Sequence, residues 1–116
     1  MVGHIGYVNQ HSPHNAPLSY ADYPDLIDSI LQTAVGAGKG IEVNTTGYYK
    51  YGEPMPAPDT IRRFLELGGE IITVGSDAHF KNVVGAKYGE AVGLLKTLGA
   101  KYVCTFEKMK PVFHKI

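Results

Sequence analysis

Two residues with side chains that can bind a metal ion follow one short apolar segment. Asp77 and His79 come directly after Ile71–Gly75, a run typical of a buried strand. In parallel α/β proteins, functional side chains gather just beyond the C-terminal ends of strands. A carboxylate oxygen beside an imidazole nitrogen suits zinc, manganese or iron better than calcium or magnesium. The alternative is a helix-capping Asp with a surface His, and spacing alone does not decide between the two interpretations.

Polar residues also interrupt two other apolar segments. His4 lies in Val2–Val8, where a lone His is more often a hydrogen-bonded core residue than a metal ligand. Glu42 and Asn44 occupy the polar positions of Ile41–Asn44, which alternates as a strand does. If helices cover the apolar positions of this strand, Glu42 and Asn44 point toward a pocket or a barrel lumen. A buried Glu indicates an ion pair or support of a metal ligand, whereas the alternative is an edge strand with a solvated face.

Two loops carry further candidate side chains. His11 and His14, in the loop 9–21, are a weak metal signal and indicate an exposed position or the rim of a substrate site. The loop 45–58 surrounds Lys50 with three tyrosines, which suits the grip of a planar substrate and suits a subunit contact equally well.

Composition excludes several classes of function. Eleven basic and eleven acidic residues leave a formal net charge of zero, so nucleic acid and anionic membranes are not expected partners. Neither a Walker lysine motif nor a Gly-x-Ser-x-Gly sequence is present, which removes the usual support for a P-loop or a serine hydrolase. Cys104 is the only cysteine, so no internal disulfide can form, and we expect a cytoplasmic protein without a membrane span.

The elements that must position these side chains alternate along the chain. Helical periodicity is predicted after a cap at Asp22, after Pro58, and within Asn82–Leu98. Between and around the helices we predict four strands and a short basic tail; the strands are Val2–Val8, Ile41–Asn44, Ile71–Val74 and Tyr102–Phe106. The order β-α-β-α-β-α-β predicts parallel strands, either as a small open sheet or as an arc of a (β/α) barrel, because four strands cannot close a barrel.

The candidate residues together resemble the polymerase-and-histidinol-phosphatase (PHP) superfamily, within it the histidinol-phosphatase branch. Four segments carry the resemblance: Val2–His4, Ile41–Gly47, Gly75–His79, and Val84–Gly85 at the expected start of the third helix. The sequence Gly-Ser-Asp-Ala-His at 75–79 is the specific one. The resemblance covers nearly all of residues 1–116 and implies the C-terminal half of a PHP domain, whose N-terminal half is absent.

The resemblance implies a distorted seven-stranded TIM-like (β/α) barrel with a multinuclear site for zinc, manganese or iron. His4, Asp77 and His79 fall on metal-ligand positions, and Asp77 and His79 are also implied in catalysis. Phosphatases of this kind carry a basic residue soon after the position of Gly47; here two tyrosines come first and Lys50 is the base. Lys50 and Asn44 are therefore the implied substrate-binding residues, for a small phosphorylated substrate.

Two functions follow as expectations. The first is metal-dependent phosphomonoester hydrolysis by the complete domain, with this chain inactive alone because three ligands cannot complete a multinuclear site. The second is a non-catalytic metal-binding or assembly module that retains part of the barrel. An arc of strands leaves sheet edges exposed, so we also expect self-association or pairing with a separate N-terminal half.

Overall fold

The computed structural model describes residues 1–11 and 18–116 of the chain. Two strands, β1 (Ile41–Asn44) and β2 (Ile72–Gly75), pair in parallel at the centre of the molecule. The hairpin of β3 (Tyr102–Glu107) and β4 (Lys110–Lys115) forms a separate antiparallel sheet. The helices are α1 (Pro24–Gly36), α2 (Gly47–Lys50), α3 (Pro58–Glu66) and α4 (Tyr88–Thr97), with short 3-10 turns at Tyr7–His11, Tyr20–Asp22 and Lys81–Val83.

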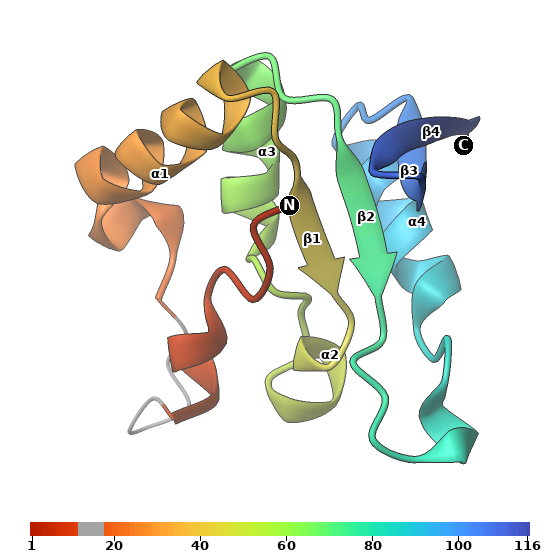
Figure 1. Ribbon diagram of the computed structural model, residues 1–116. Helices are drawn as coiled ribbons and strands as arrows, with labels where there is room; N and C mark the ends of the chain where they lie inside the picture. The colour runs from red at the N-terminus through yellow and green to blue at the C-terminus, as the bar shows by residue number, and fades with distance from the viewer. Residues whose placement is uncertain (12–17) are drawn as a thin grey trace.

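The parallel sheet has one apolar and one polar face. Its register pairs Ile41 with Ile72 and Glu42 with Thr73, so that side chains alternate between the faces in step. Ile41 and Ile72 are fully buried in the main core, together with Phe64 of α3 and Leu95 of α4. Figure 1 shows α3 and α4 behind the two strands. The predicted polar face is therefore confirmed: Glu42 lies opposite the side that the helices cover.

The first predicted strand is wrong apart from one residue. Val2 forms a parallel bridge with Ile41, and its backbone bonds to Gly40 and Glu42 continue the sheet by one position. Beyond Val2 the chain turns, because His4 has a φ of 56° and Gly6 a φ of 88°, neither of which fits a strand. The 3-10 turn at Tyr7–His11 then occupies the end of the predicted strand and the start of the predicted loop.

The predicted basic tail is also wrong, because it forms strand β4. A two-residue turn joins β3 to β4, and both of its residues, Lys108 and Met109, have positive φ angles of 47° and 68°. Such a turn has the backbone of type I′, which is usually built from Asn and Gly. β4 runs antiparallel to β3, and β3 is not hydrogen-bonded to β2, so the prediction of four parallel strands does not hold.

The three predicted helices are present, and the first and third begin later than predicted. Tyr23 rather than Asp22 is the N-cap residue of α1, and the Asp22 carboxylate accepts hydrogen bonds from Ser19 instead. The third helix begins at Tyr88, so Val84 and Gly85 precede it rather than open it; Gly85 has a φ of 70°. The loop 45–58 contains the short helix α2, which was not predicted. No helix in the described part of the chain is long and apolar enough to cross a membrane.

Candidate metal and phosphate site

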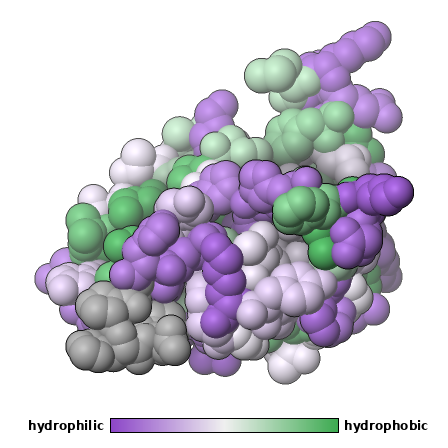
Figure 2. Space-filling model, turned by 90° about the horizontal axis from the view of Figure 1, so that it is seen from below, coloured by the Kyte–Doolittle hydropathy of each residue, from purple (hydrophilic) through white to green (hydrophobic). Residues whose placement is uncertain are grey.

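Three predicted site residues lie close together beyond the C-terminal ends of the parallel strands. Nε2 of His4 is 3.5 Å from Oδ2 of Asp77, and Nε2 of His79 is 3.8 Å from Oδ1 of the same carboxylate. Asp77 follows β2 directly, while His4 follows the residue that bridges to β1. The Asp77 carboxylate thus lies between two imidazoles. Figure 2 views this end of the strands and shows hydrophilic residues across much of it, with hydrophobic residues in separate patches.

The three side chains differ in their access to solvent. The side chain of His79 is 80% exposed, that of His4 50%, and that of Asp77 31%. This gradient places the carboxylate deepest and His79 at the outside. Two of these residues also hold unusual backbone conformations, since His4 has a φ of 56° and Asp77 a φ of 47°. Residues other than glycine enter this left-handed region at a conformational cost, which functional sites often carry.

The loop that carries Asp77 and His79 is tied to the end of β1. Thr45 donates a hydrogen bond of 2.7 Å from Oγ1 to the carbonyl of Ala86, and Thr46 donates one of 3.2 Å to the carbonyl of Ser76. Within the loop, Oγ of Ser76 accepts a hydrogen bond from the backbone of Gly85. Sequence reasoning missed this role of the two threonines. The available signal was a pair of hydroxyl residues directly after a buried strand.

Glu42 and Asn44 lie behind this cluster on the polar face of β1. Oε2 of Glu42 accepts a 3.2 Å hydrogen bond from the backbone N–H of His4. Asn44 is fully buried; its Oδ1 accepts from the backbone of Thr46, and its Nδ2 has no partner in the described residues. Because Asn44 is fully buried, its side chain is not accessible to a substrate in this structure. Substrate binding by Asn44 stays a prediction.

Lys50 lies at the end of α2 and contacts the segment after His4. Its ammonium group donates a hydrogen bond to Oε1 of Gln10, and Nε2 of Gln10 contacts Sδ of Met55 at 3.6 Å. Tyr49 beside it is exposed, whereas the buried hydroxyl of Tyr51 has its pKa raised to about 12, by burial first and by Glu53 second. The three tyrosines around Lys50 therefore do not form one continuous exposed surface.

The aromatic rings near His4 form a short row. The rings of His4 and Tyr7 are 5.8 Å apart, and so are those of Tyr7 and His11, in edge-to-face arrangements. His11 is exposed, as predicted for a rim residue. The prediction for His14 lies outside the described residues.

The donor types of His4, Asp77 and His79 suit a divalent transition ion, but the set is incomplete. The two imidazoles face different oxygens of Asp77, so the donors are directed to two sides of the carboxylate. Among residues 1–11 and 18–116, no three His, Cys, Asp or Glu side chains converge closely enough to hold one ion. The described residues thus bring one carboxylate and two imidazoles near one another without forming a set of three converging donors.

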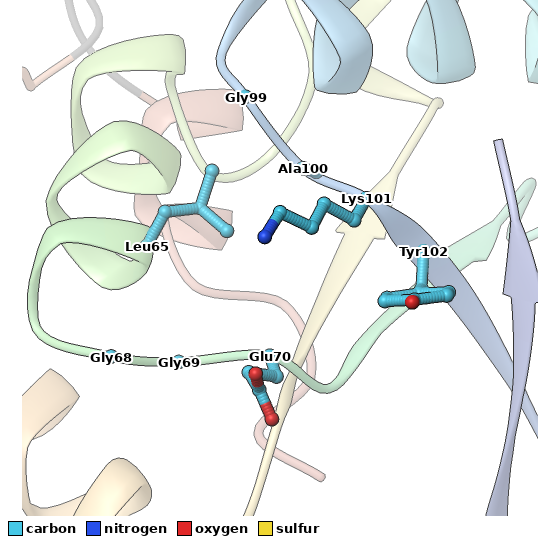
Figure 3. A pocket seen from close by; sticks show the side chains of 8 residues that line it. All are labelled: Leu65, Gly68, Gly69, Glu70, Gly99, Ala100, Lys101 and Tyr102. Atoms are coloured by element: carbon cyan, nitrogen blue, oxygen red, sulfur yellow. The ribbon is translucent and has the colours of Figure 1, made fainter.

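A small hollow lies at the opposite ends of the strands. It has a volume of about 220 Å³ and is lined by the turns after α3 and α4, including Leu65, Glu70, Lys101 and Tyr102. In Figure 3 the Lys101 side chain extends toward Leu65, and the Glu70 carboxylate points away from it. None of the candidate site residues lines this hollow, so it is separate from the metal-binding candidates.

Comparison with known proteins relates the chain to phosphatases. A probable histidinol-phosphatase of Thermotoga maritima is 34% identical over 98 residues, covering 74% of this chain and 42% of the relative. A probable histidinol-phosphatase of Clostridium acetobutylicum is 32% identical over 108 residues, covering 92% of this chain and 42% of the relative. No protein-family model matches the sequence.

A solved structure gives the same relationship. The histidinol phosphate phosphatase of Lactococcus lactis, crystallised with zinc, L-histidinol and phosphate, superposes with a TM-score of 0.69 at 25% identity. The match covers 82% of this chain and 36% of that one.

The fold and the cluster define a mixed α/β protein with its polar side chains gathered beyond parallel strands. The chain is histidinol-phosphatase-like over its matched residues, which confirms the resemblance to that branch of the PHP superfamily. The relatives are phosphatases and hence hydrolases. This chain spans about two fifths of the length of the curated relatives that it matches.

Proposed function

We propose that this chain supplies part of the site of a metal-dependent phosphomonoesterase of the histidinol-phosphatase type. One observation carries the proposal: His4 and His79 approach opposite oxygens of Asp77, within a chain that is histidinol-phosphatase-like. The substrate class is a small phosphorylated molecule, because the relatives are named for histidinol phosphate and the Lactococcus lactis structure contains L-histidinol and phosphate.

Each residue has a proposed role. His4 and His79 bind metal through neutral imidazole nitrogens, and ionised Asp77 binds through its two oxygens. Zinc, manganese or iron at this position supplies an acidified water and neutralises phosphate charge. Lys50 docks the phosphate as a cation from the end of α2, and Asn44 holds the loop after β1 through its bond to Thr46.

The complete site requires donors beyond those of this chain. Three ligands do not fill the coordination shells of a multinuclear site, and the described donors do not converge on one ion. We therefore propose that residues 1–116 correspond to the C-terminal part of a distorted TIM-like PHP barrel, and that the other ligands come from a further segment or chain. The same lack of convergence favours a second candidate, a metal-binding or assembly module without catalysis.

An open edge of the parallel sheet suggests where such a partner attaches. Among the described residues, β2 pairs with β1 alone, so its other edge has no hydrogen-bonded strand beside it (Figure 1). We expect self-association or pairing with an N-terminal half, because soluble proteins seldom leave sheet edges and faces open. Light scattering tests this, and a monomer at high concentration contradicts it.

Activity is tested with the chain alone and with the chain joined to the part of a histidinol phosphatase that the alignment leaves uncovered. With zinc or manganese, the joined protein is expected to hydrolyse histidinol phosphate, and the chain alone is expected to be inactive. Asp77→Asn should lower the rate about 100-fold or more, because metal-ion catalysis contributes several kcal/mol. Its melting temperature should change little. A joined protein that binds zinc and hydrolyses no phosphomonoester supports the module instead.

A further inference from the structure

The carboxylate of Glu42 lies between the two segments that carry His4 and Asp77. Its Oε2 accepts the hydrogen bond from the backbone of His4. Its Oε1 faces Gly75, and a Cβ atom built on Gly75 would lie only 2.7 Å from that oxygen. One side chain from β1 therefore hydrogen-bonds to His4 and lies beside Gly75, two residues before Asp77, and the side chains of His4 and Asp77 approach to 3.5 Å.

Two glycines make room for this carboxylate. Gly75 is not among the glycines with a positive φ, so its backbone does not require glycine. The space that a Cβ of Gly75 would occupy is taken by Oε1 of Glu42. Gly3 differs in degree, because its Cβ would lie 3.4 Å from Oε2, an ordinary contact distance. An added methyl group would therefore clash with the Glu42 carboxylate at Gly75 and would only touch it at Gly3.

His4 needs such support because its backbone is held at a φ of 56°. The left-handed conformation costs free energy for a residue with a side chain, and surrounding contacts must hold it there. The hydrogen bond from its N–H to Glu42 is a contact that acts on that backbone directly.

We propose that Glu42 is a positioning residue that sets His4 against Asp77. This inference rests on the proposed function, in which His4 and Asp77 are metal ligands. Glu42 acts through the backbone of its neighbours: one oxygen fixes His4, and the other occupies the space beside Gly75. Groups that orient metal ligands contribute on the order of 10–100-fold to metal affinity.

The variants Glu42→Ala, Glu42→Gln, Gly75→Ala and Gly3→Ala test this. Gln keeps an oxygen that can accept the His4 N–H, so Glu42→Gln should retain most of the wild-type arrangement. Glu42→Ala removes the acceptor, and Gly75→Ala displaces it. Gly3→Ala is the matched control, because it adds the same methyl group at an ordinary contact distance from the same carboxylate.

Two readouts are used on the 116-residue chain. In metal-free NMR spectra, the His4 amide proton should shift upfield in Glu42→Ala and Gly75→Ala and stay near its wild-type position in Glu42→Gln and Gly3→Ala. In zinc titrations against a chelator, the first two variants should lose about 10–100-fold in affinity and the other two little. Thermal unfolding of each variant checks that the fold is kept.

The outcomes separate the two ideas. Wild-type protein that binds no zinc refutes the metal part of the proposed function, while the His4 amide shift still tests the positioning role. Wild-type protein that binds zinc as tightly as Glu42→Ala refutes the positioning role alone. Equal losses in Gly3→Ala and Gly75→Ala also overturn it, because the space beside the carboxylate is then not what matters.

Discussion

The guanidinium of Arg63 in α3 donates two hydrogen bonds to the carboxylate of Asp28 in α1, of 2.8 and 2.7 Å. This bidentate pair connects the two helices beside the core. The hydrogen bonds from Arg63 are the largest cause that lowers the pKa of Asp28, and desolvation opposes them. A lowered folded-state pKa means that the stabilisation is present above the unfolded-state pKa of about 3.9 and is lost as the pH falls toward the folded value.

Asp28→Asn should therefore reduce the acid sensitivity of folding. Urea unfolding of wild type and variant is measured between pH 7 and pH 3. The difference in the free energy of unfolding should be largest at neutral pH and shrink below about pH 4. Asp25→Asn, at an exposed position of the same helix, serves as the control. A difference between wild type and Asp28→Asn that is constant with pH contradicts the role of this ion pair.

The turn between β3 and β4 predicts a stabilising substitution. Met109 has a φ of 68° and is 93% exposed, so its side chain contributes little packing. Met109→Gly should raise the free energy of unfolding by about 1 kcal/mol, because glycine adopts this conformation without the cost that a Cβ brings. Met109→Ala keeps the Cβ and should give no such gain. Chemical denaturation of the three proteins measures the effect, and equal stabilities of the Gly and Ala variants would refute it.

Loss of His79 should weaken zinc binding far more than loss of His11. His79 faces Asp77, whereas His11 contacts the ring of Tyr7 at the exposed end of the aromatic row. Removal of one ligand from so small a set should reduce affinity by orders of magnitude, on the order of 100-fold. Competition titrations of wild type, His79→Ala and His11→Ala make the comparison. If His79→Ala binds zinc as wild type does, His79 is no ligand.

Lys50→Ala should raise KM more than it lowers kcat in the joined, active protein. A cation that docks phosphate equally in the ground state and the transition state affects mainly substrate binding. Lys39→Ala is the control, because the exposed Lys39 precedes β1 at the other end of the sheet. Steady-state kinetics with histidinol phosphate decide the point. An unchanged KM with a lower kcat assigns Lys50 to the chemical step.

The sequence predicted the elements with strong local patterns and missed those that depend on turns. Apolar and polar residues alternate clearly in Ile41–Asn44, which forms β1 with the predicted bounds. The second predicted helix begins at Pro58, the residue that marked its start in the sequence. β4 was missed because Lys108–Met109 lacks the glycine or asparagine that marks a two-residue hairpin. The strand at Val2 was predicted too long, since a non-glycine residue at positive φ, His4, leaves no sequence signal.

For the candidate site, the placement of Asp77 and His79 beyond a strand follows from the pattern of parallel α/β proteins, whereas their role as ligands stays a prediction. His4 and Asp77, which the resemblance assigns to metal-ligand positions, lie 3.5 Å apart. The support around them was less predictable. The carboxylate of Glu42 hydrogen-bonds to His4 and lies beside Gly75. This placement depends on the parallel register of β1 and β2, which the alternation of apolar and polar residues does not specify.

The left-handed backbones of His4 and Asp77 place function and folding in conflict. Glycine at either position would relieve the conformational cost and remove a donor at the same time. A selection for thermal resistance alone should therefore enrich glycine at these two positions, whereas a selection for bound metal should exclude it. The proposed metal donors are therefore also positions at which the backbone conformation lowers the free energy of unfolding. Variants at these positions that melt at a higher temperature should bind the metal ion less tightly.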